Sequence, residues 1–200
     1  MAYRPADREH QRLASATYLA ALAHDGQFRK DERVPYLVHP LRVGEILAHA
    51  GAEDDVIIAG VLHDVLEDGC LDERGKPRVD EEEIRQELGA SVLELVRAAS
   101  EPDKEASWEE RKQHTIDSLS AASLQVLQVV CADKLDNVSS AIEDERRLGS
   151  VFWYRFNRPR EDQRWYYQSL LTVFLARSEE DPTLALLASR YETAVSTLYG

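Results

Sequence analysis

The stretch Gly60–Asp68, which reads GVLHDVLED, sets polar side chains at the end of the most apolar part of the chain. The residues before it, from Val56 onward, are hydrophobic all round, and a helix of that kind lies buried in the centre of a domain. Steps of four residues would place four polar groups on one side of this helix: His63, Asp64, Glu67 and Asp68. Burying an imidazole and three carboxylates is costly unless a positive charge compensates, so the pattern favours a metal ion. The alternative is a helix end that simply emerges into solvent.

Two further segments supply residues of the same chemical type. Asp133 interrupts an apolar stripe in Val129–Asn137, which reads VVCADKLDN, and His39 lies in Pro35–Pro40, which reads PYLVHP. An aspartate at such a place is also typical of a helix cap or a salt-bridge partner. Two histidines with two aspartates offer nitrogen and oxygen ligands. Such a set suits a borderline-to-hard divalent ion, such as Mn²⁺, Fe²⁺, Co²⁺ or Zn²⁺, with positions left for water.

The hydrophobic periodicity is helical almost throughout the chain, so we expect an all-α fold of about eight to nine helices in one bundle. The polar segment Asp72–Arg78 predicts a loop or a short hairpin, and Gly149–Arg160 predicts a loop rich in aromatic residues and arginine. The expected helices cover Gln11–Leu22, Pro40 to Gly51, Val56–Glu67, Asp80–Leu88, Ser91–Ala99, a stretch that Ser107 opens, Leu124–Glu145, Glu161–Ala176 and Pro182–Leu198.

The composition narrows the class of protein. The 200 residues carry a formal net charge of −13, with 44% hydrophobic and 30% charged residues, which fits one globular domain and excludes intrinsic disorder. So acidic a chain lacks the basic face that duplex nucleic acid requires. Because no apolar run is long enough for a membrane span, no secretory signal is visible and the two cysteines lie far apart, we expect a cytoplasmic protein with no nucleic-acid or membrane partner.

Several segments together resemble one known family. They read AHDGQFRK (Ala23–Lys30), PYLVHP, GVLHDVLED and CADKLDN (Cys131–Asn137), and PDKEASWEERK (Pro102–Lys112) adds to the likeness. Their order and spacing are similar to those of the HD-domain metal-dependent phosphohydrolases. Within that group they look most like the hydrolase domain of RelA/SpoT-type proteins and the stand-alone small alarmone hydrolases of the Mesh1 type.

The resemblance implies a reaction and a set of site residues. Enzymes of this type remove pyrophosphate from the ribose 3′ position of guanosine tetra- or pentaphosphate, ppGpp or pppGpp, and so release GDP or GTP. The implied ligands of Mn²⁺ are His39, His63, Asp64 and Asp133, and the implied catalytic acidic pair is Glu67 and Asp68. The implied substrate-binding residues are Arg29, Lys30, Lys104, Lys112, Lys134 and Asn137. The whole chain, residues 1–200, would form one HD-type hydrolase domain, with its core at about 8–145 and helices in 161–199 completing it.

Two segments stand apart from the family pattern. Asp31–Val34 is acidic and has no glycine where the family has a short glycine-containing turn, which leaves open a base pocket of different shape. Phe152–Arg160, together with Trp165–Tyr167, allows two interpretations. It is either a lid, with aromatic rings on a base and arginines on the phosphates, or packing for the last helices. The arginines in question are Arg155, Arg158 and Arg160.

Three functions therefore remain in view from the sequence. The leading hypothesis is a Mn²⁺-dependent alarmone 3′-pyrophosphohydrolase with a nucleotide substrate. The first rival is an HD enzyme that acts on another nucleotide, such as ppApp, NADPH or a nucleoside monophosphate. The second rival is a non-catalytic alarmone sensor, against which the presence of both Glu67 and Asp68 argues, since a sensor has no need of them.

Overall fold

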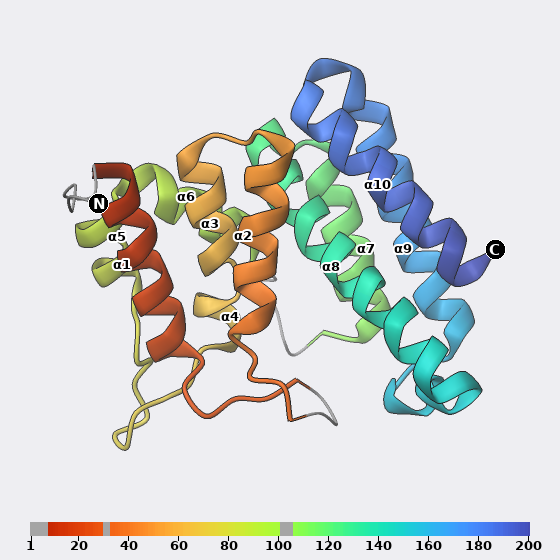
Figure 1. Ribbon diagram of the computed structural model, residues 1–200, viewed down its shortest axis with the longest axis horizontal. Helices are drawn as coiled ribbons and strands as arrows, with labels where there is room; N and C mark the ends of the chain where they lie inside the picture. Colours follow the sequence, from red (N-terminus) through yellow and green to blue (C-terminus); the bar gives the residue numbers. More distant parts are fainter. Residues whose placement is uncertain (1–7, 30–32, 101–105) are drawn as a thin grey trace, which may run out of the picture.

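Every regular element in the computed structural model, which describes residues 8–29, 33–100 and 106–200, is a helix (Figure 1). This confirms the predicted all-α fold. Among these residues, no helix has both the length and the apolar character needed to cross a bilayer. The elements are α1 (Arg8–Ala23), α2 (Val38–Ala50), α3 (Asp54–Leu62), α4 (Val65–Asp68), α5 (Glu81–Leu88), α6 (Ala90–Ala99), α7 (Trp108–Ser120), α8 (Leu124–Leu148), α9 (Arg160–Arg177) and α10 (Pro182–Tyr199), with the short 3₁₀ helices η1 (Gly149–Arg155) and η2 (Ser178–Glu180).

The long helix α8 lies between the two halves of the molecule. It packs against α2 and α3 on one side and against α9 and α10 on the other (Figure 1). Every residue from Val126 to Asp133 is buried, because the apolar side chains of this stretch meet protein on all sides. A charged group in this part of α8 therefore faces other helices instead of bulk water.

The helices α2 and α3 approach each other closely at two glycines. A Cβ atom on Gly60 would lie 2.4 Å from Cδ1 of Leu47, and a Cβ atom on Gly44 would lie 2.6 Å from Cγ2 of Val61. Real Cβ atoms essentially never approach another heavy atom to less than 3.0 Å, so the two backbones are this close only because both positions lack a side chain. The close approach brings the start of α2 next to the end of α3.

The helix predicted over Val56–Glu67 is divided in two, so the prediction of one continuous helix is wrong. α3 ends at Leu62, and the single turn α4 begins at Val65. His63 Nδ1 lies 2.8 Å from the carbonyl oxygen of Gly60, where it competes with the backbone N–H that would continue the helix. The four polar side chains predicted to lie on one side nevertheless line a common cavity, and His63 is buried.

Helix starts and the polar loop follow the sequence more closely. Ser107 Oγ accepts a hydrogen bond from Glu110 N at 3.3 Å, and the Glu110 side chain accepts one from Ser107 N at 2.9 Å, which is the expected capping box. The segment Asp72–Arg78 forms a hairpin-like turn that an isolated antiparallel bridge between Leu71 and Pro77 closes.

The segment predicted as a loop over Gly149–Arg160 begins as the 3₁₀ helix η1, so the prediction is wrong for its first part. The buried ring of Phe152 lies 5.0 Å from that of Trp153 and 5.2 Å from that of Phe156, both edge to face. The Arg160 guanidinium lies 5.3 Å from the Trp153 ring centroid and donates to the carbonyl oxygen of Leu198 at 2.7 Å. Packing of the last helices, one of the two interpretations above, accounts for Trp153 and Arg160.

Replacing Gly60 by alanine tests the close approach of α2 and α3. A glycine-to-alanine change inside a helix is normally stabilising by about 0.5–1 kcal/mol. We expect Gly60→Ala instead to lower the free energy of unfolding by about 1–3 kcal/mol, because the new methyl group overlaps Leu47. Urea denaturation followed by circular dichroism measures the change. An equal or higher denaturation midpoint would contradict the expectation and show that Leu47 moves aside freely.

Candidate active site

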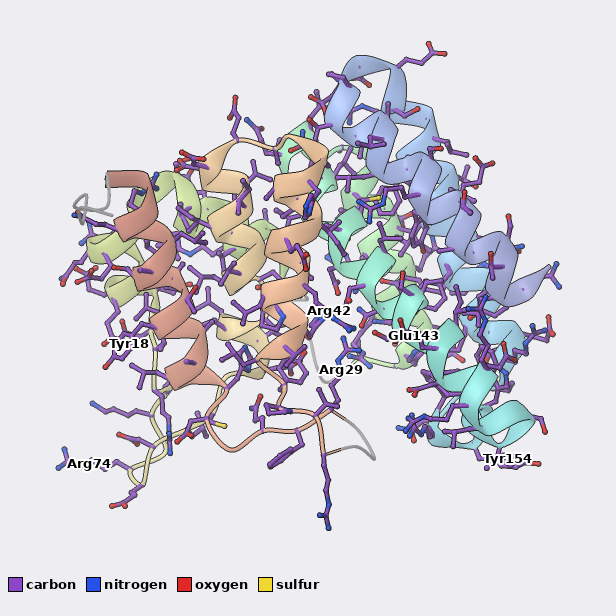
Figure 2. All side chains as sticks on the ribbon, in the orientation of Figure 1. Tyr18, Arg29, Arg42, Arg74, Glu143 and Tyr154 are labelled. Atoms are coloured by element: carbon purple, nitrogen blue, oxygen red, sulfur yellow. The ribbon has the colours of Figure 1, made fainter. Side chains whose placement is uncertain are left out.

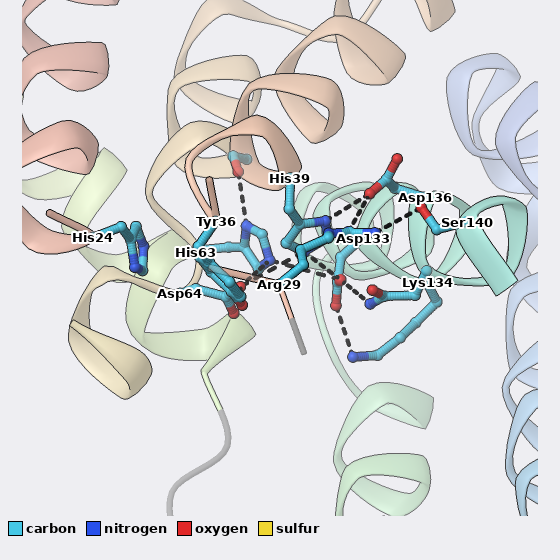
Figure 3. A network of polar contacts seen from close by, with 12 residues as sticks. His24, Arg29, Tyr36, His39, His63, Asp64, Asp133, Lys134, Asp136 and Ser140 are labelled. Atoms are coloured by element: carbon cyan, nitrogen blue, oxygen red, sulfur yellow. Dashed lines mark hydrogen bonds and ion pairs between the residues drawn. The ribbon is translucent and has the colours of Figure 1, made fainter. Parts of the chain in front are cut away.

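Side chains from α2, α8 and the break between α3 and α4 meet at one point, as Figure 3 shows. His39 Nε2 lies 3.2 Å from Asp133 Oδ1 and 3.6 Å from Asp64 Oδ2. His63 Nε2 lies 3.1 Å from Asp64 Oδ2 and 3.7 Å from Asp133 Oδ1. Both imidazoles thus turn Nε2 toward the same two carboxylates, which lie on either side of them (Figure 3). All four residues that the resemblance implies as metal ligands are therefore neighbours.

Hydrogen bonds at the far nitrogen of each imidazole fix this orientation. His39 Nδ1 lies 2.7 Å from Asp136 Oδ2, and His63 Nδ1 lies 2.8 Å from the Gly60 carbonyl oxygen. Donation from both Nδ1 atoms leaves the Nε2 lone pairs for a metal ion. His63 Nε2 is a buried nitrogen atom with no hydrogen-bond partner, which is what a metal ligand seen without its ion looks like.

The spacing of the ligand atoms also fits a single divalent ion. Oxygen and nitrogen ligands held about 2.0–2.2 Å from one ion lie roughly 3–3.6 Å from each other. The four distances between Nε2 and carboxylate oxygens, 3.1 to 3.7 Å, are close to that range. Ligand atoms of His39, His63 and Asp64 all lie within 4.8 Å of one another, and Asp133 joins them from α8. The cluster is therefore compatible with metal binding.

The charges at this point hold both carboxylates in the ionised form. Burial is the largest single influence and raises the pKa of Asp64, but the charges of His63 and His39 and the hydrogen bond to His63 together lower it by more, so the net shift is downward. Burial has the same effect on Asp133, and there the charge of Lys134 together with the two imidazoles lowers the pKa well below its ordinary value. Conversely, burial lowers the pKa of His63, and the charges of Asp64 and Asp133 raise it overall. A cation entering this site competes with protons, so its affinity falls as the pH falls.

Neighbouring polar groups orient the two carboxylates. Tyr36 Oη donates to Asp64 Oδ2 at 2.6 Å, and Asn137 Nδ2 donates to Asp133 Oδ1 at 2.6 Å. Lys134 Nζ lies 2.7 Å from Asp133 Oδ2. The sequence analysis predicted that Asn137 and Lys134 bind the substrate. In the structure both side chains contact Asp133. The sequence analysis did not identify Tyr36 as a site residue, although Tyr36 lies in the PYLVHP segment, three positions before His39.

Arg29, which the sequence suggests as a substrate-binding residue, is fixed by α8. Its guanidinium donates to Asp136 Oδ2 and to Ser140 Oγ, each at 2.7 Å. Figure 2 shows Arg42 beside Arg29, and an Arg42 nitrogen lies 3.7 Å from the other Asp136 oxygen. Asp136, only 3% exposed, therefore links these arginines to His39. The sequence analysis did not predict this supporting role of Asp136. The position of Asp136 one helical turn after Asp133 was the signal that could have indicated it.

The cluster opens into a cavity of about 610 Å³, which we call the metal cavity. Glu67 and Asp68, the expected catalytic pair, line this cavity together with Lys112. The structure thus brings these three side chains to the same cavity as the metal cluster. Lys30 and Lys104, the two other lysines that the resemblance implies at the substrate, lie outside the described residues.

A second cavity, of about 240 Å³, meets the first at Tyr36, His39 and Asn137. Arg29 lies in its wall, as does Ser140. The rest of the wall is largely aromatic and comes from η1, α9, α10 and the residue that follows η1: Phe152, Trp153, Phe156, Tyr167 and Tyr199. This cavity, which we call the aromatic cavity, suits a flat ring better than a phosphate.

Comparison with known proteins gives the family. A family model described as HD domain matches residues 16–151. The chain belongs to the HD-domain family. It is 35% identical over 163 residues to a mouse protein named guanosine-3′,5′-bis(diphosphate) 3′-pyrophosphohydrolase MESH1, a match that covers 80% of this chain and 83% of that protein. It is 30% identical over 155 residues to the bifunctional (p)ppGpp synthase/hydrolase SpoT of Escherichia coli, covering 74% of this chain and 20% of SpoT.

Solved structures agree with this assignment. The crystal structure of lmo0812 from Listeria monocytogenes has a TM-score of 0.67 and 33% identity, covering 83% of this chain and 98% of that one. A structure reported for a metazoan ortholog of SpoT has a TM-score of 0.68 over 99% of this chain and 97% of that one, at 23% identity, which shows the same fold. Family membership and these relatives confirm the expected enzyme class, a metal-dependent phosphohydrolase. The chain corresponds to about a fifth of the length of the SpoT relative.

Replacing His39 tests the metal cluster. We expect His39→Ala to lose stoichiometric binding of a divalent ion, measured by elemental analysis after dialysis against the metal, because one of two imidazole ligands is gone. His49→Ala is the matched control, since His49 lies on the same helix, is exposed, and has its Nδ1 atom 3.0 Å from the Glu45 carbonyl oxygen, away from the cluster. Equal metal content in the two variants would contradict the assignment of His39 as a ligand.

Proposed function

We propose that this protein is a divalent-metal-dependent 3′-pyrophosphohydrolase of guanosine 3′,5′-bis(diphosphate) and the corresponding pentaphosphate, with Mn²⁺ as its preferred ion. One observation carries the proposal. The His/Asp cluster, which could hold a metal ion, shares one cavity with Glu67 and Asp68. The aromatic cavity, which is suited to a nucleotide base, adjoins that cavity at His39. The names of the mouse and Escherichia coli relatives supply the substrate class.

In this proposal His39, His63, Asp64 and Asp133 hold the ion, as their convergence supports. When bound, a divalent ion acidifies a water molecule and polarises a phosphoryl oxygen. Mixed imidazole and carboxylate ligands suit Mn²⁺, although Fe²⁺, Co²⁺ and Zn²⁺ accept a similar set. Asp136 and Tyr36 then keep His39 and Asp64 in their ligating orientation.

Glu67 and Asp68 are the proposed catalytic residues of the same cavity. Glu67 orients the attacking water and takes its proton, and Asp68 is its partner in that step. The water oxygen attacks the phosphorus of the group at the 3′ oxygen, the bond to that oxygen breaks, and the 3′ hydroxyl receives a proton. Lys112 and Lys134, both on the wall of the cavity, offset the negative charge of the departing pyrophosphate.

The aromatic cavity is the proposed base site. Rings of η1 and α9 offer a flat surface for the guanine, and Arg29 and Asn137 stand where the base and the sugar would meet the metal cavity. Lys30 and Lys104 remain proposed substrate contacts on the resemblance alone. Stacking accepts any purine, and this tolerance keeps an adenine nucleotide such as ppApp as the second candidate substrate.

The whole chain is proposed to act as one HD-type domain. The matched family region covers residues 16–151, and α10 packs against α8, the helix that carries Asp133. The segment 161–199 would then complete the core at about 8–145. Both cysteines are free, which is consistent with the proposed cytoplasmic location.

Product analysis tests the reaction and the metal together. We expect purified protein with Mn²⁺ to convert ppGpp to GDP and pyrophosphate, and to lose this activity when EDTA is added. Ion-exchange chromatography with a pyrophosphate assay identifies the products, with pppGpp, ppApp and NADPH tested in parallel. Hydrolysis of NADPH or ppApp but not of ppGpp would be consistent with the proposed metal site and would contradict ppGpp as the substrate.

Replacing Glu67 tests the acidic pair. We expect Glu67→Gln to lower kcat by about 10²–10⁴-fold with metal content unchanged, because the amide cannot take the proton from water. Glu73→Gln, the same chemical change at an exposed glutamate of the polar loop, serves as the control. Normal turnover by Glu67→Gln, or loss of the bound metal in this variant, would contradict the role of Glu67.

A further inference from the structure

The acidic pair of the metal cavity stands on a single helical turn. α4 contains only four residues, ends at Asp68, and is followed by Gly69 in an extended conformation. Asp68 N donates to the carbonyl oxygen of Asp64 at 2.8 Å. One turn of helix is not stable in water by itself. The positions of Glu67 and Asp68 therefore depend on the contacts that other parts of the chain make with α4.

The C-terminal end of α1 and the residues after it supply such contacts. Gln27 Nε2 donates to the carbonyl oxygen of Asp68 at 2.7 Å. Two residues beyond Asp68, Cys70 N donates to the carbonyl oxygen of Ala23, also at 2.7 Å. α1 packs directly against α4. Of the two hydrogen bonds, the one from Gln27 comes from a side chain, so a substitution can remove it and leave the main chain intact.

His24 holds the Gln27 amide in the orientation that this bond requires. His24 Nδ1 lies 2.8 Å from Gln27 Oε1. Because Gln27 Nε2 donates to Asp68, Oε1 is the acceptor of the amide, and His24 Nδ1 donates to it. His24 is only 3% exposed, and its Nε2 atom has no hydrogen-bond partner among the described residues. A buried ring keeps the hydrogen bond that it makes, so the amide of Gln27 is not free to turn over.

Gln27 also connects α4 to a ligand of the cluster. The carbonyl oxygen of Gln27 accepts a hydrogen bond from Tyr36 N at 2.9 Å. Tyr36 Oη in turn donates to Asp64 Oδ2, and the Tyr36 ring lies 4.8 Å from that of His24. Gln27 thus bonds both the segment that orients Asp64 and the turn that carries the acidic pair. These bonds fix the two sets of carboxylates relative to each other.

His24 and Gln27 lie outside the cavities where the reaction would occur. Among the described residues, neither side chain lines the metal cavity or the aromatic cavity. In Figure 3, His24 stands apart from the side chains that converge on the cluster. An effect of either residue on the reaction therefore passes through α4 or through Tyr36.

We infer that Gln27, held by His24, is a positioning residue for the reaction. It fixes the main chain of α4 so that Glu67 and Asp68 stand where they can act on the attacking water. The inference rests on the proposed function, since it takes the acidic pair as catalytic. Such support matters because a displacement of about 1 Å at a catalytic group can lower the rate by about 10²-fold.

Gln27→Met tests the inference, because it removes the hydrogen bond to Asp68 and keeps the length of the side chain. We expect kcat for ppGpp to fall by about 10–10²-fold, with KM and metal content unchanged. Amide hydrogen exchange of α4, measured by mass spectrometry, should become faster by about 2–10-fold, as the loss of one hydrogen bond implies. Gln86→Met is the matched control, since Gln86 is an exposed glutamine of α5 that bonds Glu82. Unchanged exchange of α4 in Gln27→Met would overturn the inference.

Two variants of His24 separate positioning from a general loss of stability. His24→Asn places an amide N–H near the position of Nδ1–H, whereas His24→Leu removes the donor. We expect His24→Leu to lower kcat and to loosen α4 as Gln27→Met does, and His24→Asn to restore most of both properties. Equal losses in the two variants would contradict the role of the imidazole as the donor that holds Gln27.

The double variant Gln27→Met/Glu67→Gln tests whether Gln27 acts through the acidic pair. Residues that act as a unit have non-additive effects, so we expect the double variant to be no slower than Glu67→Gln alone. A further loss by the same factor as in Gln27→Met would overturn the inference. If Gln27→Met loosens α4 while Glu67→Gln turns over normally or ppGpp is not hydrolysed, the anchor of α4 stands and the proposed function fails. If ppGpp is hydrolysed and Gln27→Met retains full kcat, the proposed function stands and the inference fails.

Discussion

The burial of two ionised carboxylates against two imidazoles is the constraint on which the rest of the structure depends. Asp133 and both imidazoles are less than 10% exposed. Removing so many charged and polar groups from water is costly unless each finds a partner. Asp136 and Tyr36 supply partners on the protein side, and the inward-facing Nε2 atoms and carboxylate oxygens are left to a cation. Protons on the imidazoles balance these carboxylates, or a metal cation does so in their place.

Bringing these groups together requires α2, α3 and α8 to be unusually close. Gly44 and Gly60 let the side chains of Val61 and Leu47 pack directly against the backbone of the facing helix, and α8 is buried where it meets α2 and α3. The same packing stops α3 at Leu62, since the His63 side chain bonds a carbonyl of its own helix instead of extending it. The break after α3 and the close packing of α2 on α3 thus contribute to one arrangement. In it, His39 at the start of α2 and His63 at the end of α3 lie next to each other.

Sequence reasoning reached the helical fold, and it singled out the residues of the His/Asp cluster, because both leave local signals. Helix periodicity and capping residues are short-range features, and His63 with Asp64 stands out within an apolar run. The break after Leu62 was not predictable in this way, because the hydrogen bond from His63 to Gly60 depends on the side-chain orientation that His63 adopts in the packed fold. The contact of Arg29 with Asp136 was also out of reach, since the two residues lie 107 positions apart in the chain and meet only in the assembled fold.

The spacing of polar residues on α8 explains how one helix serves several tasks. Asp136, Asn137 and Ser140 stand three, four and seven positions after Asp133, so the four residues lie along one face of α8. Asp133 faces the cluster, Asp136 fixes His39 and Arg29, and Asn137 stands between the metal and aromatic cavities. Lys134, one residue on from Asp133, lies in the wall of the same cavity as the cluster, and its charge stabilises the ionised form of that carboxylate. A shift of α8 along its axis would therefore disturb the metal ligands and the cavity walls together. The C-terminal helices α9 and α10 pack on α8, so they help to fix the position of the helix that carries these side chains.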